Sequence, residues 1–231
     1  MQRSRRGFLA IAALAIAVAS VPPARGMDRA DDLQASGFGP RASDRPRLTL
    51  TFVDFTELPE DISAALQAEV TDLVATLGVA ADIQTMPPGS LLDTDAITLI
   101  VLPGVAPANL TRGVMGAVQR EGASRVLWIY ASSVAAGTRL GWGDRRRWSV
   151  QQREDFATAL ARVAVHEVVH LVCPWRDHDD QGLMAGMLTH ASLTGSRIPF
   201  SRELRREFTL GVDSMAGAAF SVARGGPAPR H

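Results

Sequence analysis

The stretch between Ser149 and Pro174 restricts the fold most, because it predicts one long buried helix. Ser149 and Gln152 form a capping-box pattern at its start, and Pro174 ends it. Apolar residues then recur at helical spacing: Phe156, Leu160, Ala164, Val168 and Leu171. The β-branched run VAVHEVVHLV also suits a strand, but the helix-forming sequence upstream favours a helix over Val150–Val172.

This predicted helix carries the pentapeptide HEVVH, His166 to His170. On a helix the two histidines are one turn apart, with Cβ atoms about 5–6 Å from each other. Their ring nitrogens can then bind one Zn²⁺ at about 2.1 Å, with Glu167 beside the metal. By composition alone, the pattern is expected only a few times in a thousand chains of this kind. We therefore predict one zinc ion held by His166 and His170.

A catalytic zinc needs a third protein ligand and an open position for water. The polar loop after Pro174 offers His178, twelve residues after His166, as that ligand. Alternative oxygen ligands in the same loop are Asp177, Asp179 and Asp180. His178 could also be a solvated loop residue, so the sequence leaves the third ligand open among these.

The other segments predict an α/β (α+β) fold, in which helices cover a mixed sheet. The expected strands are 47–55, 81–85, 96–104 and 125–134, and the expected helices lie in 58–78, in 107–121 and in a segment capped by Ser201. With 231 residues and 46% hydrophobic residues, the chain suffices for one domain, which we place at 47–222.

Composition excludes some classes of function. The 24 basic and 24 acidic residues balance, so the basic excess of a nucleic-acid-binding protein is missing and no nucleic-acid partner is expected. Cys173 is the one cysteine, which rules out an intramolecular disulfide. Although it lies near HEVVH, we interpret it as a small buried apolar residue.

The N-terminus predicts export. Arg3, Arg5 and Arg6 precede an apolar stretch, Phe8 to Ala19, which is shorter than the roughly 20 residues of a spanning helix. We predict a signal peptide at 1–26, a flexible linker (or latency segment) at 27–46, and a disordered tail at 223–231. The segment Ser4 to Ala10 resembles the twin-arginine signal; the alternative is an ordinary signal peptide. The expected location is periplasmic or secreted, without stable membrane insertion after cleavage.

The order His166, Glu167, His170, His178 and then Gly182-Leu183-Met184 resembles the metzincin clan of zinc peptidases. It is most similar to small bacterial members in which the third histidine falls two residues later than usual. The resemblance implies a metzincin-like twisted sheet, a long zinc-binding active-site helix and a C-terminal helical subdomain. Met184 would be an apolar floor beneath the metal. This chain departs from the usual pattern at Cys173, where the clan has glycine, and at Arg176, where it has the third ligand.

The implied activity is that of an exported zinc metallopeptidase, in which Glu167 is the general base for a zinc-activated water. The resemblance further implies a peptide or protein substrate lying extended along an edge strand, for which 125–134 is the candidate. We expect a monomer. No tyrosine follows Met184, so tyrosine assistance is not implied.

Three alternatives remain. The chain could be an inactive metzincin-like protein that binds zinc structurally. It could hold a thermolysin-type site with Glu203 (or Glu207) as the third ligand, or its histidines could bind no metal at all.

Overall fold

The computed structural model describes residues 45–91, 93, 95–107, 113–119, 125–195 and 199–223, with side chains through 217. All of them lie in one compact unit, Pro40–His231. The predicted signal peptide (1–26), nearly all of the predicted linker (27–46) and residues 224–231 of the predicted tail lie outside the described residues. No helix in the described part is long and apolar enough to cross a bilayer.

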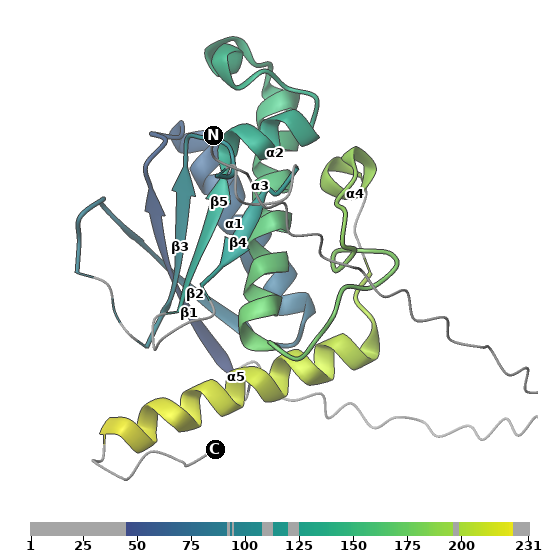
Figure 1. Cartoon of the computed structure of the whole chain (residues 1–231). Helices are drawn as coiled ribbons and strands as arrows, with labels where there is room; N and C mark the ends of the chain where they lie inside the picture. Colours follow the sequence, from purple (N-terminus) through teal and green to yellow (C-terminus); the bar gives the residue numbers. More distant parts are fainter. Residues whose placement is uncertain are drawn as a thin grey trace, which may run out of the picture. The chain divides into compact units, whose positions relative to one another are not determined.

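Five strands form one mixed sheet, which confirms the predicted fold class (Figure 1). They are β1 (Arg47–Asp54), β2 (Ala80–Met86), β3 (Ile97–Leu102), β4 (Gly116–Val118) and β5 (Val126–Tyr130). Their spatial order is β2-β1-β3-β5-β4. β1, β2, β3 and β5 run parallel, whereas β4 pairs antiparallel with β5, so β4 is an edge strand.

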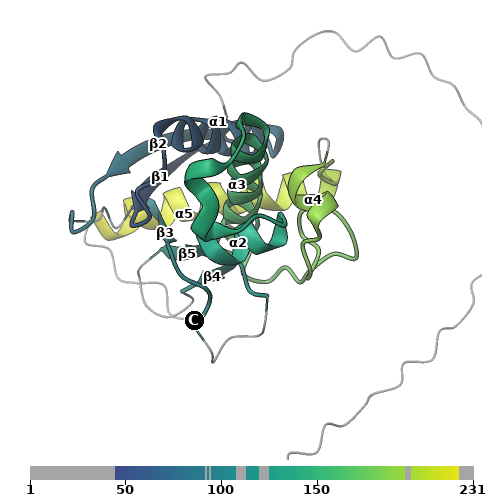
Figure 2. The ribbon, with the colours of Figure 1, turned by 90° about the horizontal axis from the view of Figure 1, so that it is seen from above.

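Helices pack against this sheet and against one another. They are α1 (Glu60–Thr76), α2 (Ala131–Gly137), the 3-10 helix η2 (Trp142–Arg147), α3 (Val150–Val172), α4 (His190–Thr194) and α5 (Arg202–Ala223). α1 and α3 pack against each other and against the sheet, α1 next to β2 and α3 next to β4 and β5 (Figure 2). α5 crosses the C-terminal end of α3, where Gly211 lies against Val172 (Figure 1).

The predicted boundaries of α3 are confirmed, and its ends show why. The Ser149 N–H donates to the Gln152 side chain at 2.8 Å, and the Gln152 N–H donates to Ser149 Oγ at 3.2 Å. This reciprocal capping box satisfies two donors that the first turn leaves without helical partners. From Phe156 onward most side chains are buried, so the helix runs through the centre of the core.

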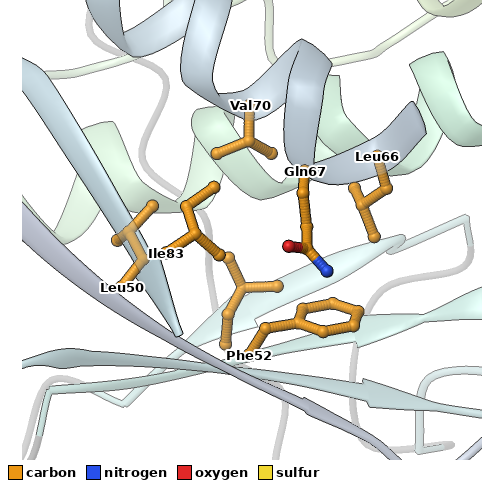
Figure 3. Close-up of a pocket in the computed structure, with 7 residues that line it drawn as sticks. Leu50, Phe52, Leu66, Gln67, Val70 and Ile83 are labelled. Carbon is orange, nitrogen blue, oxygen red and sulfur yellow. The ribbon is translucent and has the colours of Figure 1, made fainter. Parts of the chain in front are cut away.

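The apolar layer between α1 and the sheet is close-packed. Leu66, Gln67 and Val70 of α1 face strand residues that include Leu50 and Phe52 (Figure 3). The space they enclose is about 10 Å³, which is no more than about one water needs. This small cavity therefore belongs to the core and offers no room for a ligand.

Two predictions about the region between β3 and α2 are wrong. The segment 107–121 was expected to be a helix, but Gly116–Val118 forms β4. The predicted strand 125–134 ends at Tyr130, where α2 begins. Three residues of strand carry little periodicity of their own, and β4 exists because β5 pairs with it. As a consequence β5 is an interior strand, not the edge strand that the sequence suggested.

Candidate metal centre

Three histidine rings converge at the C-terminal half of α3. His170 Nε2 lies 3.1 Å from His166 Nε2 and 3.1 Å from His178 Nε2. His166 and His170 come from successive turns of α3 and are each 7% exposed, whereas His178 reaches them from the following loop and is exposed. Among the described residues, these three form the group of His, Cys, Asp and Glu side chains that could hold a metal ion.

The spacing of the nitrogens suits a metal. Two nitrogens at about 2.0–2.1 Å from a tetrahedral centre are about 3.3–3.4 Å apart, close to the observed separations. His166 Nδ1 lies 2.7 Å from the carbonyl oxygen of Leu183, and because a carbonyl only accepts, Nδ1 carries the proton. His166 Nε2 therefore presents a lone pair to the centre of the cluster. Zinc fits this donor set, and the hydrogen bond fixes the ring as metal-binding histidines usually require.

Burial also keeps His166 in the neutral form that a metal needs. Desolvation lowers the pKa of His166, and the neighbouring His178 lowers it further, while the hydrogen bond to Leu183 acts in the opposite direction. A neutral imidazole is therefore favoured at neutral pH.

The turn Gly182-Leu183-Met184-Ala185 contacts the cluster through the Leu183 carbonyl. Gly182 has a φ of +81°, which glycine adopts without strain, and the Ala185 N–H donates to the Gly182 carbonyl at 3.3 Å. This turn aims the Leu183 carbonyl at His166 and buries Met184, which is 1% exposed. Met184 is thus a core residue of this turn, and its role as an apolar floor beneath the metal stays a prediction.

Glu167 lines a cleft next to the histidines. The cleft has a volume of about 660 Å³ and is bordered by the His166, His170 and His178 rings, by residues 113–116 leading into β4, and by residues 185–188 after the turn. The cleft is partly open to solvent, so a water and a substrate group have access to the rings. Gly116 lies against the Glu167 side chain across this cleft.

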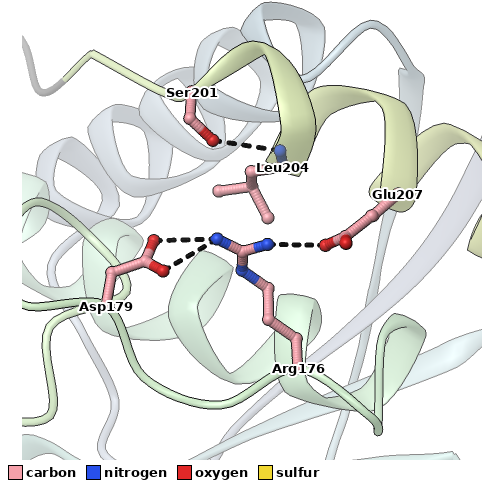
Figure 4. A network of polar contacts seen from close by, with 5 residues as sticks. All are labelled: Arg176, Asp179, Ser201, Leu204 and Glu207. Carbon is pink, nitrogen blue, oxygen red and sulfur yellow. Dashed lines mark hydrogen bonds and ion pairs between the residues drawn. The ribbon is translucent and has the colours of Figure 1, made fainter. Parts of the chain in front are cut away.

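The alternative ligands are not in the cluster. Asp179 instead makes a bidentate ion pair with Arg176, and Glu207 on α5 pairs with the same guanidinium (Figure 4). Asp177 and Asp180 stay on the exposed surface of the loop, as does Glu203 on α5. The thermolysin-type arrangement is therefore not what this structure shows.

Cys173 is a buried residue of the core. It is fully buried, and the pKa of its thiol is raised to about 11, chiefly by burial and also by Glu207, while Arg176 acts in the opposite direction. The interpretation as an apolar core residue is confirmed.

The mixed five-stranded sheet with its covering helices has a counterpart among solved structures. In particular, the crystal structure of archaemetzincin from Methanopyrus kandleri is similar, with a TM-score of 0.52 over 75% of this chain and 98% of that chain. The two sequences are 13% identical, so the likeness is one of fold. No protein-family model and no curated protein matches the chain.

Proposed function

We propose that this protein is an exported zinc-dependent peptidase in which His166, His170 and His178 hold one zinc ion. The observation that carries the proposal is the convergence of three ring nitrogens beside Glu167, in a cleft open to solvent. The metzincin-like fold, shared with archaemetzincin, supports the same reading. A purely structural zinc site is usually closed by four protein ligands, whereas the described residues offer three candidates in this cluster.

The residues divide the chemistry of peptide hydrolysis among them. When bound, zinc supplies a Lewis acid that polarises a carbonyl group and lowers the pKa of water toward about 7. A carboxylate oxygen of Glu167 accepts a proton from the attacking water and passes it to the nitrogen of the leaving amine. The His166 ring, held by the Leu183 carbonyl, keeps its lone pair directed at the centre throughout. Met184 supports the rings from below as an apolar floor.

The substrate we propose is an extended peptide paired with β4. One edge of β4 is taken by β5, and in the described sheet β4 is the last strand, so its other edge has no strand partner. Residues 113–116, which lead into β4, border the cleft that holds the histidines. A peptide added at this edge would run past Glu167 and the three rings, as in β-augmentation. β4 thus replaces the 125–134 segment as the candidate strand for substrate binding.

The proposed setting follows from the sequence. The twin-arginine-like segment Ser4 to Ala10 supports export to the periplasm or beyond, and the charge balance supports a peptide partner and not a nucleic acid. We propose that the exported protein is a monomer without membrane insertion.

The purified protein should contain about one zinc ion and cleave an unstructured protein such as casein. Glu167→Ala should retain the zinc and lower kcat by about 10²–10⁴-fold, because only the base is lost. Glu154→Gln, an exposed glutamate on the same helix, is the matched control and should cleave normally. His178→Ala should weaken zinc binding, whereas Glu203→Gln should not.

The position of the single tyrosine favours a second candidate function, that of a zinc-binding protein without peptidase activity. The chain has a single tyrosine, Tyr130, which ends β5 and does not follow Met184. If the wild-type protein binds zinc but cleaves nothing across a broad peptide library, it is an inactive metzincin-like binding protein. Absence of zinc from the folded protein would end both readings.

A further inference from the structure

The three candidate ligands are held in place to very different degrees. His166 and His170 are buried and fixed by α3 itself, whereas His178 is exposed and belongs to a loop without regular secondary structure. His178 follows His170 by eight residues, so the path of the loop decides whether its ring reaches the cluster. Whatever orders this loop therefore controls the third ligand.

Arg176 stands at the centre of the contacts that order the loop (Figure 4). Its guanidinium binds Asp179 through two hydrogen bonds, at 2.8 and 3.0 Å, and also binds Glu207 of α5. The Arg176 side chain is only 12% exposed, so these ion pairs are more strongly shielded from water than ordinary surface pairs. One guanidinium nitrogen, Nη2, contacts both oxygens of Asp179, and the other, Nη1, binds Glu207. The planar fork thus joins two carboxylates in a fixed geometry, which a lysine would not do.

The residues that make these contacts flank His178 along the chain. Arg176 and Asp179 lie on either side of Asp177 and His178, and their ion pair closes the four residues into a tight loop. The Asp179 N–H then donates to the Met184 carbonyl at 2.8 Å, which ties the loop to the turn that contacts the cluster. Gly186 packs against the His178 ring, since a Cβ placed there would be 3.5 Å from its Cγ.

α5 does not need Arg176 in order to dock. Leu204, Phe208 and Val212 of α5 are buried in the core, and Gly211 lies against Val172 at the end of α3. Because α5 is held by these apolar contacts, it keeps the Glu207 carboxylate in position to bind Arg176 in the loop.

We propose that Arg176 is a positioning residue for the metal centre, which joins Asp179 and Glu207 to hold the His178 ring in the cluster. The proposal rests on the proposed zinc site. It also gives α5 a function at that site. Although α5 contributes no ligand, its Glu207 binds Arg176 and so affects the affinity of the site for the metal. Arg176 occupies the position at which the usual clan pattern has its third ligand, so the side chain there supports a ligand two residues later.

The test is a double-mutant cycle on zinc affinity, measured on the full chain by competition with a chromophoric chelator. Arg176→Gln should weaken zinc binding by about 10–100-fold, the usual effect of removing a group that orients a metal ligand. In a His178→Ala background the same change should have no further effect, because Arg176 acts through His178. Arg176→Lys should fall between wild type and Arg176→Gln, and Glu207→Gln should lose less than Arg176→Gln, since the Asp179 pair survives.

Arg153→Gln is the matched control. Arg153 also joins two elements by an ion pair, with Asp61 at 3.0 Å, but this pair is more exposed and belongs to no contact of the cluster. It should leave zinc affinity unchanged. A visible spectrum of the cobalt-substituted protein supplies a second readout, because loss of one imidazole alters the coordination of cobalt in Arg176→Gln and not in Arg153→Gln.

The experiment distinguishes failure of the Arg176 inference from failure of the proposed zinc site. Zinc affinity of Arg176→Gln within about twofold of wild type overturns the inference, as does an equal loss with and without His178. If Arg176→Gln fails to fold, Glu207→Gln carries the same cycle. A wild-type protein that binds no zinc defeats the proposed function itself, whereas one that binds zinc without cleaving peptides still tests Arg176.

Discussion

Gly116 of β4 and Glu167 of α3 are so close that a Cβ at position 116 would lie 2.6 Å from Cγ and 2.7 Å from Oε1 of Glu167. A side chain of any size at 116 must therefore displace the carboxylate. The absence of a Cβ lets the proposed base lie against the proposed substrate strand, so that base, metal ligands and peptide edge share one cleft.

Gly116→Ala should impair catalysis without impairing metal binding. Moving the carboxylate by about 1 Å can cost up to about 10²-fold in kcat, while the three imidazoles stay in place and zinc affinity is retained. Because the clashing atoms belong to the flexible Glu167 side chain, which lines an open cleft, the free energy of unfolding should fall by no more than about 1 kcal/mol, the lower end of the cost of overpacking. Steady-state kinetics, zinc titration and urea unfolding measure the three quantities.

Two further variants identify the cause of that loss. In a Glu167→Ala background, Gly116→Ala should cost little stability, because the colliding atoms are gone. Gly104→Ala places a Cβ in open space and should leave both activity and stability near wild type. Equal destabilisation with and without the Glu167 side chain would contradict the steric explanation.

Ser149→Ala should lower the free energy of unfolding by about 1 kcal/mol, because it removes the cap of α3. Zinc affinity should not change, since the cap is at the opposite end of the helix from His170. Urea unfolding of the metal-free protein measures the effect. Gln151→Ala, which loses only an exposed contact with Asp155, should cost no more than a few tenths of a kcal/mol.

Cys173 should be inert in the folded protein. With its pKa raised to about 11 and the side chain fully buried, a thiol reagent at pH 8 should label it only after unfolding. The pH dependence of stability has a definite sign. Above about pH 9 the unfolded thiol loses its proton while the folded one keeps it, so stability should fall between about pH 9 and 11. Cys173→Ala should reduce that fall, and rapid labelling of the native protein would refute the assignment.

Removal of the metal should loosen the loop after α3 more than the rest of the fold. The proposed zinc links His166 and His170 to His178, and at a zinc concentration of about 100 times Kd this link stabilises the fold by about 2.7 kcal/mol. A chelator should therefore lower Tm and increase amide hydrogen exchange in residues 174–184, while β3 remains protected. Uniform exchange over the whole domain would indicate that the metal holds more than this loop.

Local sequence was sufficient for α3 and for the first two histidines. The capping box at Ser149, the proline at 174 and the spacing of apolar residues are all short-range signals, and they defined the helix to the residue. Once the helix is known, the separation of His166 and His170 by one turn follows from helical geometry. Cys173 was likewise interpreted correctly from its apolar surroundings.

Sequence alone could not decide the edge of the sheet or the surroundings of Glu167. β4 has three residues, and only pairing with β5 makes it a strand. Glycines stand at 113 and 116 within the segment predicted as a helix, yet nothing in the local pattern indicated that Gly116 faces a glutamate 51 residues later. Edge and interior positions depend on which strands pair, and that is a contact between distant parts of the chain.

The sequence by itself determined a long capped helix, two histidines one turn apart, a glutamate between them and a mixed α/β class, because short-range periodicity and capping chemistry encode these features. Only the tertiary structure brought His178, and not the neighbouring aspartates or Glu203, next to the two histidines of α3. Only it paired Arg176 with Glu207 and placed β4 at the rim of the cleft. The physical reason is that each of these features is a contact between segments that are separated in the sequence. Such contacts depend on how α5, the loop after α3 and the sheet pack together.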